Sequence, residues 1–484
     1  MSQSRLTRRV LLQSALLGGA GLLLASCGST AQAPAPAANA GQPSSNAATT
    51  SLTTASSAAT SSAAAASAAN VAGKQATITW WMASRGDDLL AFETSPKVYM
   101  QSHPGVTIQF SGDIAGVGGT PKIQSAIAAG SPPDLVQTSD YPGASGLYYT
   151  GAIPPIDDLI KASKDFDITT LEPATTAACK SFDGKQWGLP DQLYVTSDLF
   201  YNTKLLQDKG LDPTKPPTTL EELEKTAAMF DVRNGDQLVQ VGFHPSQTLS
   251  PQIYPFVFGG KFWDADKQKV TPNDAGVIAG LQWLVAYYQK YGVDNLRRIQ
   301  GGYGQYESAQ NALLAGKVAF TGFWDAMVAY RNRYAPNVPI DMAWFPYAAA
   351  HPEAKGAGTI GFNPTFIPKG TKQRDLAWDI LKFNETDTDT VLQTSILLAN
   401  TPQSVAAIQS PAASKADPLL KKCWDYAARG KMNIFPPPIP ANAQYAQEWK
   451  TQTDLIVGGK ATVQEGMQKI IDVVQPQVDK ALKG

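Results

Sequence analysis

Aromatic residues are absent from the first 73 residues of this chain, and this asymmetry limits what the chain can fold into. All 10 tryptophans, 17 tyrosines and 17 phenylalanines lie in residues 74–484. Residues 28–73 are almost entirely Ala, Ser, Thr, Pro, Gly, Asn and Gln, with no charged residue. Such a segment buries too little apolar surface to offset its chain entropy, so we expect a disordered linker. The 411 residues that follow are too many for one ordinary core and predict two lobes.

Residues 1–27 have the organisation of an export signal. Three arginines precede an apolar run over residues 10–24, which is shorter than the ~20 residues of a membrane span. The pair Arg8-Arg9 lies in a segment that resembles a twin-arginine signal, and Leu-Ala-Ser-Cys at residues 24–27 resembles a lipobox. We therefore expect Cys27 to be lipidated and to anchor the protein outside the cytoplasm, at the cell surface or in a periplasm. The alternative is an uncleaved anchor with a buried cysteine.

Composition and motifs argue against several classes of function. The chain without its leader is weakly acidic and has no basic run, which argues against nucleic acid as a partner. His103, His244 and His351 are scattered, with no Cys/His cluster that would predict a metal site. No Gly-rich phosphate loop or nucleophile elbow is present, so we expect no cofactor. Cys179 and Cys423 either form a disulfide or stay as buried free thiols, and their spacing does not decide between the two.

Strand and helix patterns alternate at the start of the folded part. Residues 77–82 alternate like a first strand, and residues 106–110 repeat the pattern. Thr120 followed by Pro121 is typical of a helix start, with Thr120 as the cap, and residues 134–137 predict a third strand. This order predicts a parallel sheet with helices on its faces.

The alternation resumes further along the chain. Residues 199–202 predict a buried strand, Thr218 and Glu221 predict a capping box, and residues 462–482 predict a final helix. Ligands of open α/β sheets lie at the carboxyl ends of the strands. Two such lobes that face each other form a cleft, and the loops after the strands should line it.

Several segments match the motifs of one known family, in the same order. Residues 126–136, Ala-Ile-Ala-Ala-Gly-Ser-Pro-Pro-Asp-Leu-Val, resemble its turn and strand A-G-x-x-P-D-[IVL]-[IVF]. Residues 151–159 resemble its G-x-[IL]-x-P-L-D-x-L segment, and residues 187–206 resemble its inter-lobe crossing strand. Residues 314–324 resemble its strand and loop G-K-x-A-[FM]…G-x-W. The chain thus resembles the solute-binding lipoproteins of ABC importers, in the sugar-binding group that includes maltose-binding protein.

This resemblance implies an α/β fold of the periplasmic-binding-protein type, with a ligand cleft between two lobes that are each discontinuous in sequence. We place the first lobe at residues 74–193 plus 341–395 and the second lobe at residues 194–340 plus 396–484. The resemblance also implies a monomer that captures a sugar or oligosaccharide and delivers it to the transmembrane subunits of an ABC importer. Such a protein binds its ligand without catalysis, so no enzymatic activity is expected.

Sugar hydroxyls require polar side chains, and sugar rings stack on aromatic faces. Trp324 matches the family's stacking tryptophan and is the strongest candidate contact. Ser84, Arg85 and Asp87 follow the first strand, where the family places hydroxyl-binding residues. The other candidates lie after the third strand, at the crossing strand and in later loops: Ser139, Asp140, Tyr141, Asp191, Gln192, Trp263, Asn363, Asn442 and Tyr445. The crossing segment differs from that of maltose-binding protein, so the resemblance implies no particular sugar.

Three other functions stay open at this point. The ligand could be a glycerol-phosphate ester, a polyol or a peptide, although Arg85 is the only strong cation among the cleft candidates. A glycoside hydrolase needs two carboxyl groups about 5–10 Å apart, for which Asp140 and Asp191 would be the candidates. A purely structural surface lipoprotein is disfavoured by the aromatic residues on the expected cleft loops.

Overall fold

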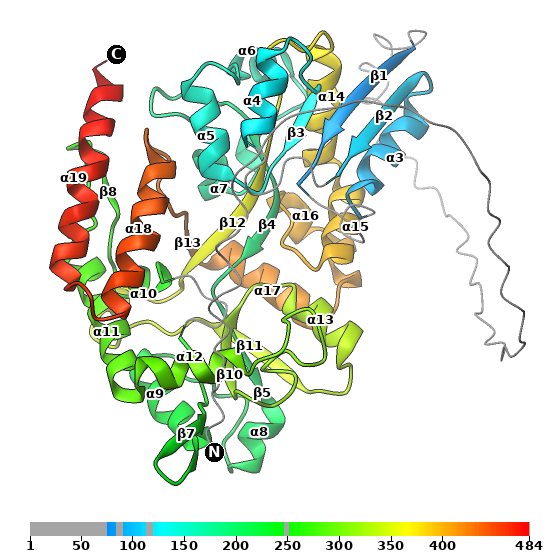
Figure 1. The fold of residues 1–484 in the computed structure, drawn as a ribbon. Helices are drawn as coiled ribbons and strands as arrows, with labels where there is room; N and C mark the ends of the chain where they lie inside the picture. Colours follow the sequence, from blue (N-terminus) through cyan, green and yellow to red (C-terminus); the bar gives the residue numbers. More distant parts are fainter. Residues whose placement is uncertain (1–74, 84–90, 113–119, 246–250, 484) are drawn as a thin grey trace, which may run out of the picture. The chain divides into compact units, whose positions relative to one another are not determined.

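The structure, a computed structural model, describes residues 75–83, 91–112, 120–245 and 251–483 (Figure 1). The export signal and the linker predicted for residues 1–73 lie outside this part. The described part contains two main sheets with helices beside them, which confirms the α/β class. No helix within it has both the length and the apolar character that a bilayer span requires.

The larger sheet is mixed and has six strands. They are β1 (Ala76–Trp81), β2 (Val106–Ser111), β3 (Leu135–Gln137), β4 (Leu189–Val195), β12 (Ala357–Phe366) and β13 (Lys431–Asn433). β1 pairs in parallel with β2 and β3, which confirms the arrangement predicted for the first three strands. β12 joins the sheet antiparallel to β3 and β4 and parallel to β13, so the sheet is not wholly parallel.

The smaller sheet has three antiparallel strands. They are β5 (Asp198–Asn202), β10 (Phe320–Phe323) and β11 (Ile340–Trp344), with β5 in the centre. Every residue of β5 is buried, as predicted for residues 199–202. Only two residues separate β4 from β5, so the chain passes directly from one sheet to the other.

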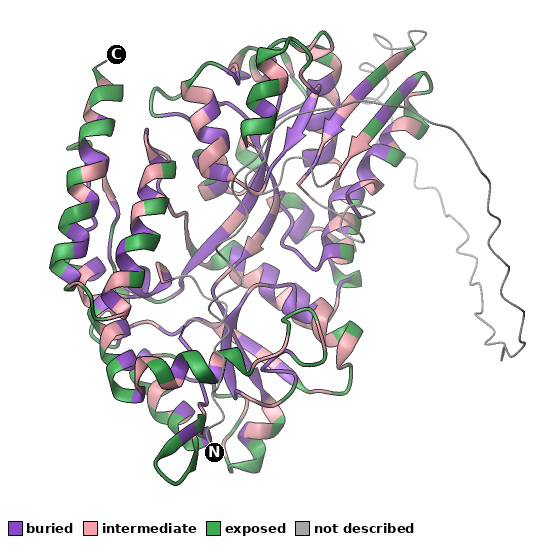
Figure 2. Cartoon of the chain, viewed as in Figure 1, coloured by how far each residue is buried: buried purple, intermediate pink, exposed green. Residues whose placement is uncertain are grey.

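Helices cover both sheets. Beside the larger sheet lie α3 (Thr94–Ser102), α4 (Thr120–Ala128), α5 (Tyr141–Tyr149), α6 (Asp157–Ala162), α7 (Pro173–Ala178), α14 (Arg374–Thr386) and α15 (Thr388–Leu398). The other helices used below are α9 (Leu220–Ala227), α10 (Ile253–Val257), α11 (Ala275–Tyr291), α12 (Val293–Gly301), α13 (Met327–Tyr334), α17 (Pro418–Arg429), α18 (Asn442–Val457) and α19 (Val463–Leu482). Figure 2 shows the strands of both sheets mostly buried, with exposed residues on the outer sides of the helices.

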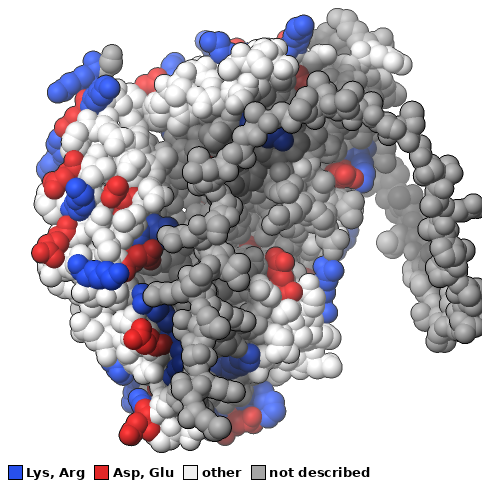
Figure 3. Space-filling view, viewed as in Figure 1, with Lys and Arg blue, Asp and Glu red and all other residues white. Residues whose placement is uncertain are grey.

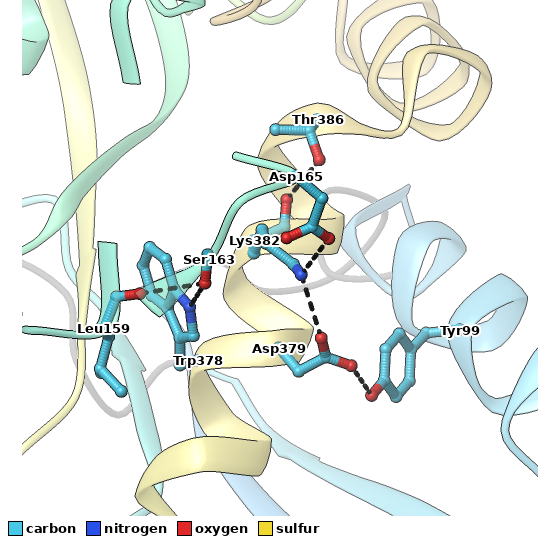
Figure 4. Close-up of polar contacts among 8 residues, drawn as sticks. All are labelled: Tyr99, Leu159, Ser163, Asp165, Trp378, Asp379, Lys382 and Thr386. Carbon is cyan, nitrogen blue, oxygen red and sulfur yellow. Dashed lines mark hydrogen bonds and ion pairs between the residues drawn. The ribbon is translucent and has the colours of Figure 1, made fainter. Parts of the chain in front are cut away.

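Polar contacts around α14 hold the helices on one face of the larger sheet (Figure 4). The Tyr99 hydroxyl of α3 donates to the Asp379 carboxylate of α14 at 2.6 Å. Lys382 lies 3.4 Å from Asp379 and 2.6 Å from Asp165, which precedes α7 in the chain. These contacts fix α14 in a position where its last turn carries Glu385 into the interior, with 0% of that residue exposed.

The chain ends in α18 and α19, which pack on each other and on α11. The predicted apolar stripe of the last helix is buried, including Met467 and Val474. α18 also contacts α5 beside the larger sheet. Elements about 300 residues apart in the sequence therefore meet at this contact.

Two helix starts differ from their predictions. Thr219, not Thr218, caps α9: its hydroxyl accepts from the N–H of Glu222 at 3.2 Å, and the Glu222 carboxylate accepts from the backbone of Thr219. Adjacent threonines both suit a cap, and the backbone conformation selects the second. Thr120 lies inside α4, and its hydroxyl donates to Asp140 at 2.8 Å.

The two cysteines of the described part are free and buried. The disulfide alternative is therefore wrong. Cys179 lies in the core beside the larger sheet, whereas Cys423 lies on α17 in a core beside the smaller sheet. Each thiol is enclosed by a different set of elements, which keeps the two apart.

Candidate functional site

A cavity of about 590 Å³ lies among α5, α11, α12, α18 and the segment that enters α10. Small-molecule sites have volumes of about 300–1,000 Å³, so this cavity has the size of a ligand site. It is lined by Pro142, Pro251, Gln252, Tyr288, Arg297, Gln300, Phe435, Pro436, Ala446, Trp449, Lys450, Thr453, Asp454 and Val457. Pro142 belongs to α5 beside the larger sheet, so the cavity lies where that layer meets the C-terminal helices.

One face of α18 supplies a wall of the cavity. Trp449 and Thr453 are four residues apart, which places them one above the other on the helix. Trp449 packs edge-on against Phe262 with 4.9 Å between ring centroids, so its indole ring is held in place. The indole Nε1 of Trp449 and the hydroxyl Oγ1 of Thr453 are buried without a hydrogen-bond partner among the described residues. Buried polar atoms are normally paired, so these two atoms are exceptions within residues that line the cavity.

Aromatic rings and hydrogen-bonding groups alternate around the rest of the cavity. Tyr288 and Phe435 add aromatic surface, and Arg297 and Gln300 add polar groups from α12. Lys450 forms an ion pair with Asp454 at 2.9 Å, but both side chains are mostly exposed and the pair contributes little stability. Basic and acidic side chains are interspersed on the face shown in Figure 3, without a large area of one sign. This combination suits a neutral, polar ligand with flat apolar faces.

Four of the predicted contacts lie at or near the meeting of α5 and α18. Asp140 is the N-cap of α5: its carboxylate accepts from the N–H of Gly143 at 3.0 Å and from Thr120. Tyr141 and Asn442 are buried, and the Asn442 side chain lies close enough to the Tyr141 hydroxyl to act on it as a hydrogen-bond partner. Burial raises the pKa of Tyr141, so it is protonated at neutral pH. Tyr445 donates to the carbonyl of Phe262 at 3.1 Å and is 0% exposed, so it is a core residue here.

A second group of predicted contacts lies on the crossing strands β4 and β12. The Asn363 amide donates to Gln192 Oε1 at 2.7 Å, and Thr365 donates to Asp191 at 3.3 Å. Gln192 has φ of +45°, and the register of β4 and β12 shifts between Phe362 and Asn363. An L residue rarely adopts this φ, and such strained positions cluster at functional sites.

Asp191 in this group is buried, and burial raises its pKa to about 6. Gln137 of β3 also donates to its carboxylate. The hydrogen-bond donors lower the pKa of Asp191, but by less than burial raises it, so Asp191 is a weaker acid than an exposed aspartate.

Trp324 lies apart from both groups, directly after β10, and does not line the cavity. Its ring stacks on Phe323 with 4.1 Å between centroids, and Tyr306 approaches edge-on at 5.4 Å. Trp324 is half-buried, whereas Tyr306 is 45% exposed. The tryptophan therefore offers only part of its surface to a ligand.

The remaining predicted contacts divide into three cases. Ser139 is half-buried between β3 and α5, and Trp263 is half-buried on the short strand β8 (Trp263–Asp264), against the core of the C-terminal helices. Ser84, Arg85, Asp87 and the lipidation site Cys27 lie outside the described residues. The roles assigned to all these residues stay predictions.

None of the residues predicted to contact a ligand lines the cavity, whose wall instead includes Arg297, Gln300, Trp449 and Thr453. Arg297 and Gln300 are three residues apart on α12, and Trp449 and Thr453 are four residues apart on α18, so each pair lies on one face of its helix. The same spacing is typical of any helix packed on a core. It indicates a ligand site only once the two helices are seen to face one cavity.

Comparison with known proteins adds an independent finding. The profile of a family described as bacterial extracellular solute-binding protein matches residues 83–387. An ABC transporter extracellular-binding protein of Pyrococcus horikoshii is 22% identical over 317 residues, which cover 60% of this chain and 68% of that protein.

Solved structures share the fold. CpMnBP1 with mannotriose bound is 28% identical, with a TM-score of 0.68 over 82% of this chain and 99% of that chain. The cyclic alpha-maltosyl-1,6-maltose binding protein from Arthrobacter globiformis is 19% identical, with a TM-score of 0.66 over 84% of this chain and 99% of that chain. MalE from Bdellovibrio bacteriovorus bound to maltotriose is 18% identical, with a TM-score of 0.62 over 84% and 100%. The two-lobe binding-protein fold expected from the sequence is confirmed.

Proposed function

Because this chain belongs to the bacterial extracellular solute-binding proteins, we propose that it captures a carbohydrate outside the cytoplasm and delivers it to an ABC importer. The cavity of about 590 Å³ is the observation that carries this proposal. Its walls combine aromatic rings with polar groups, and the lining residues Trp449 and Thr453 each carry a polar atom without a hydrogen-bond partner among the described residues. A carbohydrate supplies both ring faces and hydroxyl groups.

Binding without catalysis fits the same residues. The Asp140 carboxylate caps α5, and Asp191 is enclosed by donors, so both candidate acids already have structural partners. The family and the proteins of similar fold are binding proteins. We therefore propose that the chain has no hydrolase activity.

The proposed lobes follow the two sheets, except that β13, within residues 396–484, pairs with β12 of the larger sheet. Residues 74–193 would start the first lobe and residues 194–340 the second. β11 pairs with β5, so we propose that the chain returns to the first lobe after Trp344 rather than at residue 341. Closure of two lobes on a ligand is a hinge motion, which the transporter subunits would recognise.

The first prediction concerns the ligand. We expect one class of neutral oligosaccharide to raise the melting temperature of the protein by several degrees, because a ligand at 100 times its Kd stabilises the native state by about 2.7 kcal/mol. Mannotriose, mannobiose and maltotriose are the first probes, since proteins of the same fold hold them. Glycerol phosphates, polyols and short peptides test the alternatives, and chromatography of the sugars tests for hydrolysis.

Thr453→Val and Trp449→Phe separate ligand contacts from packing. Thr453→Val removes one unpaired polar atom and keeps the shape of the side chain, so it should not lower the stability of the free protein, whereas Trp449→Phe also shortens a buried ring and should lower that stability. Loss of one hydrogen bond to the ligand should weaken binding about 2- to 13-fold in each variant. Thr451→Val on the exposed side of the same helix is the matched control. Trp324→Ala tests the predicted stacking contact. If no carbohydrate shifts the melting temperature, or if hydrolysis products form, the proposal is wrong.

A second prediction concerns the anchor. We propose that Cys27 is lipidated and that residues 28–73 tether the folded part to the membrane. Cys27→Ser should then abolish incorporation of a labelled fatty acid and move the protein from the membrane fraction to the soluble fraction. Cys179→Ser serves as the control, because that cysteine is buried in the folded part. Equal labelling of the two variants would contradict the lipobox.

A further inference from the structure

Two buried carboxyl groups lie where the chain passes between the sheets. Asp198 is the first residue of β5 and is 2% exposed, and Asp325 is 0% exposed. Asp198 lies opposite Phe323 of β10 and Trp344 of β11, so it occupies the end of the smaller sheet that faces the crossing from β4. We call residues 196–197 and 399–401 the interlobe crossings.

Asp325 connects the Trp324 loop to these crossings. It directly follows Trp324, and its Oδ2 accepts from the Thr401 hydroxyl at 2.8 Å. The N–H of Thr401 donates in turn to the carbonyl of Leu193 in β4 at 3.0 Å. One side chain therefore ties the loop after β10 to the second crossing, which is itself bonded to the larger sheet.

Burial disfavours the anionic form of both carboxyl groups, although Thr401 and nearby backbone N–H groups donate to Asp325 and the Cys423 thiol donates to Asp198. Oδ1 of Asp325 and Oδ2 of Asp198 are buried without a hydrogen-bond partner among the described residues. Burial of an unpaired charge costs several kcal/mol, so the neutral form is favoured. Burial raises the pKa of Asp325 to about 8 and raises that of Asp198 well above its usual range, with the charge of Asp325 adding to the latter.

The titratable groups that face the two acids do not compensate their charge. Tyr194 of β4 faces Asp325, and Cys423 of α17 interacts with both acids. Lys422 acts on Cys423, and its ammonium pairs with Asp341 at 2.7 Å. No cation in the described part forms an ion pair with Asp198 or Asp325.

We propose that Asp198 and Asp325 are both protonated in the closed form, that Asp325 positions the Trp324 loop against the interlobe crossings, and that the crossings loosen as the pH rises. When the crossings open, water reaches both carboxyl groups, and they release their protons to solvent. The free energy needed to open the crossings therefore falls with each pH unit above the ordinary pKa range of a carboxyl group, until the closed form ionises as well. An effect on ligand affinity at Trp324 rests on the proposed function, whereas the effect on the crossings does not.

Alkylation of Cys423 measures this opening without any ligand. The full-length protein is treated with N-ethylmaleimide at pH 5.5 to 8.5, and labelling of each cysteine is followed by peptide mass spectrometry. At each pH, the alkylation rate of Cys423 in the wild-type protein is divided by the rate in the double variant Asp198→Asn/Asp325→Asn. We expect the ratio of their Cys423 rates to rise at least about tenfold between pH 5.5 and 7.5, because each pH unit changes the proton equilibrium tenfold.

Cys179 is the internal control, because it lies in a different core. Its ratio should stay constant with pH. A constant Cys423 ratio would overturn the proposal, and so would an equal rise at Cys179, which would show global unfolding. If the double variant does not fold, each single variant is compared instead and should show part of the pH dependence. Failure of the carbohydrate proposal would leave these rates unchanged.

Discussion

Replacing Gly280 with alanine should lower the free energy of unfolding by about 3 kcal/mol or more, because a methyl group there overpacks a helix contact. Gly280 lies on α11 where α10 crosses it. A Cβ atom at this position would lie 2.5 Å from the backbone nitrogen of Pro255 and 2.6 Å from the carbonyl carbon of Tyr254. Both are backbone atoms, so they cannot rotate away as a flexible side chain would. The helices would have to separate.

Gly146→Ala is the matched control for this change. Gly146 also lies in a helix, α5, but a Cβ atom there meets nothing within 4 Å. Alanine has a higher helix propensity than glycine, so this variant should gain up to about 1 kcal/mol. Urea denaturation of both variants gives the comparison, with equal m-values required. Equal stability of the two variants would show that α10 and α11 adjust freely.

The same contact supports the cavity. The segment entering α10 carries Gln252 and α11 carries Tyr288, and both residues line it. Separation of the two helices at Gly280 would move one wall relative to the other. We therefore expect Gly280→Ala to weaken binding of any ligand found for the cavity, although Gly280 itself does not line it.

The free energy of unfolding should fall by several kcal/mol as the pH rises from about 4 to 8, because buried acids stay protonated in the folded state. Burial raises the pKa of Asp191 to about 6 and that of Asp325 to about 8, and raises those of Asp198 and Glu385 well above their usual range. The unfolded state releases these protons near pH 4, whereas the folded state holds them up to each raised pKa. The stabilisation is complete below pH 4 and is lost as the pH rises.

Two kinds of group oppose this trend: His244, and carboxyl groups such as Asp158 and Glu222, whose pKa is lowered by hydrogen bonds and which stabilise the folded state as they ionise near pH 4. Burial lowers the pKa of His244 to about 4, so the folded state gains stability between pH 4 and 6.5, where the unfolded histidine releases its proton. One histidine offsets only part of the effect of four acids. Stability should therefore be highest at mildly acidic pH and lower at pH 8.

Asp191→Asn and Glu385→Gln test the origin of the trend. Each removes one ionisation and keeps the shape of the side chain, so each should flatten the curve between pH 4 and 8. The exposed Asp236→Asn is the control and should leave the slope unchanged. Denaturation in urea at pH 4.5, 6 and 8 gives the slopes. A slope unaltered by both core variants would show that other groups control the pH dependence.

The order of strands and helices could be predicted from short segments of the sequence. The alternation at residues 77–82 corresponds to β1, and the stripe that includes Met467 and Val474 corresponds to α19. Both signals are local, because a strand or an amphipathic helix repeats its apolar positions within a few residues. The cap of α9 was misplaced by one residue because Thr218 and Thr219 have the same chemistry.

The candidate site was predicted less completely. Asp140 was expected to contact a ligand but caps α5, and Tyr445 was expected in the cleft but lies in the core. A polar or aromatic residue near a strand end suits either role. Its neighbours in space decide between them, and those neighbours come from elements far away in the sequence.

The sequence by itself determined the class of the fold, the family and the division between a low-complexity start and an aromatic-rich folded part. Local composition, periodicity and motif order carry that information. Only the tertiary structure decided that Arg297 and Trp449 share one cavity, that both described cysteines are free thiols, and that Asp198 and Asp325 are both buried. These properties depend on which distant segments meet when the helices and sheets pack, and no local pattern specifies that geometry.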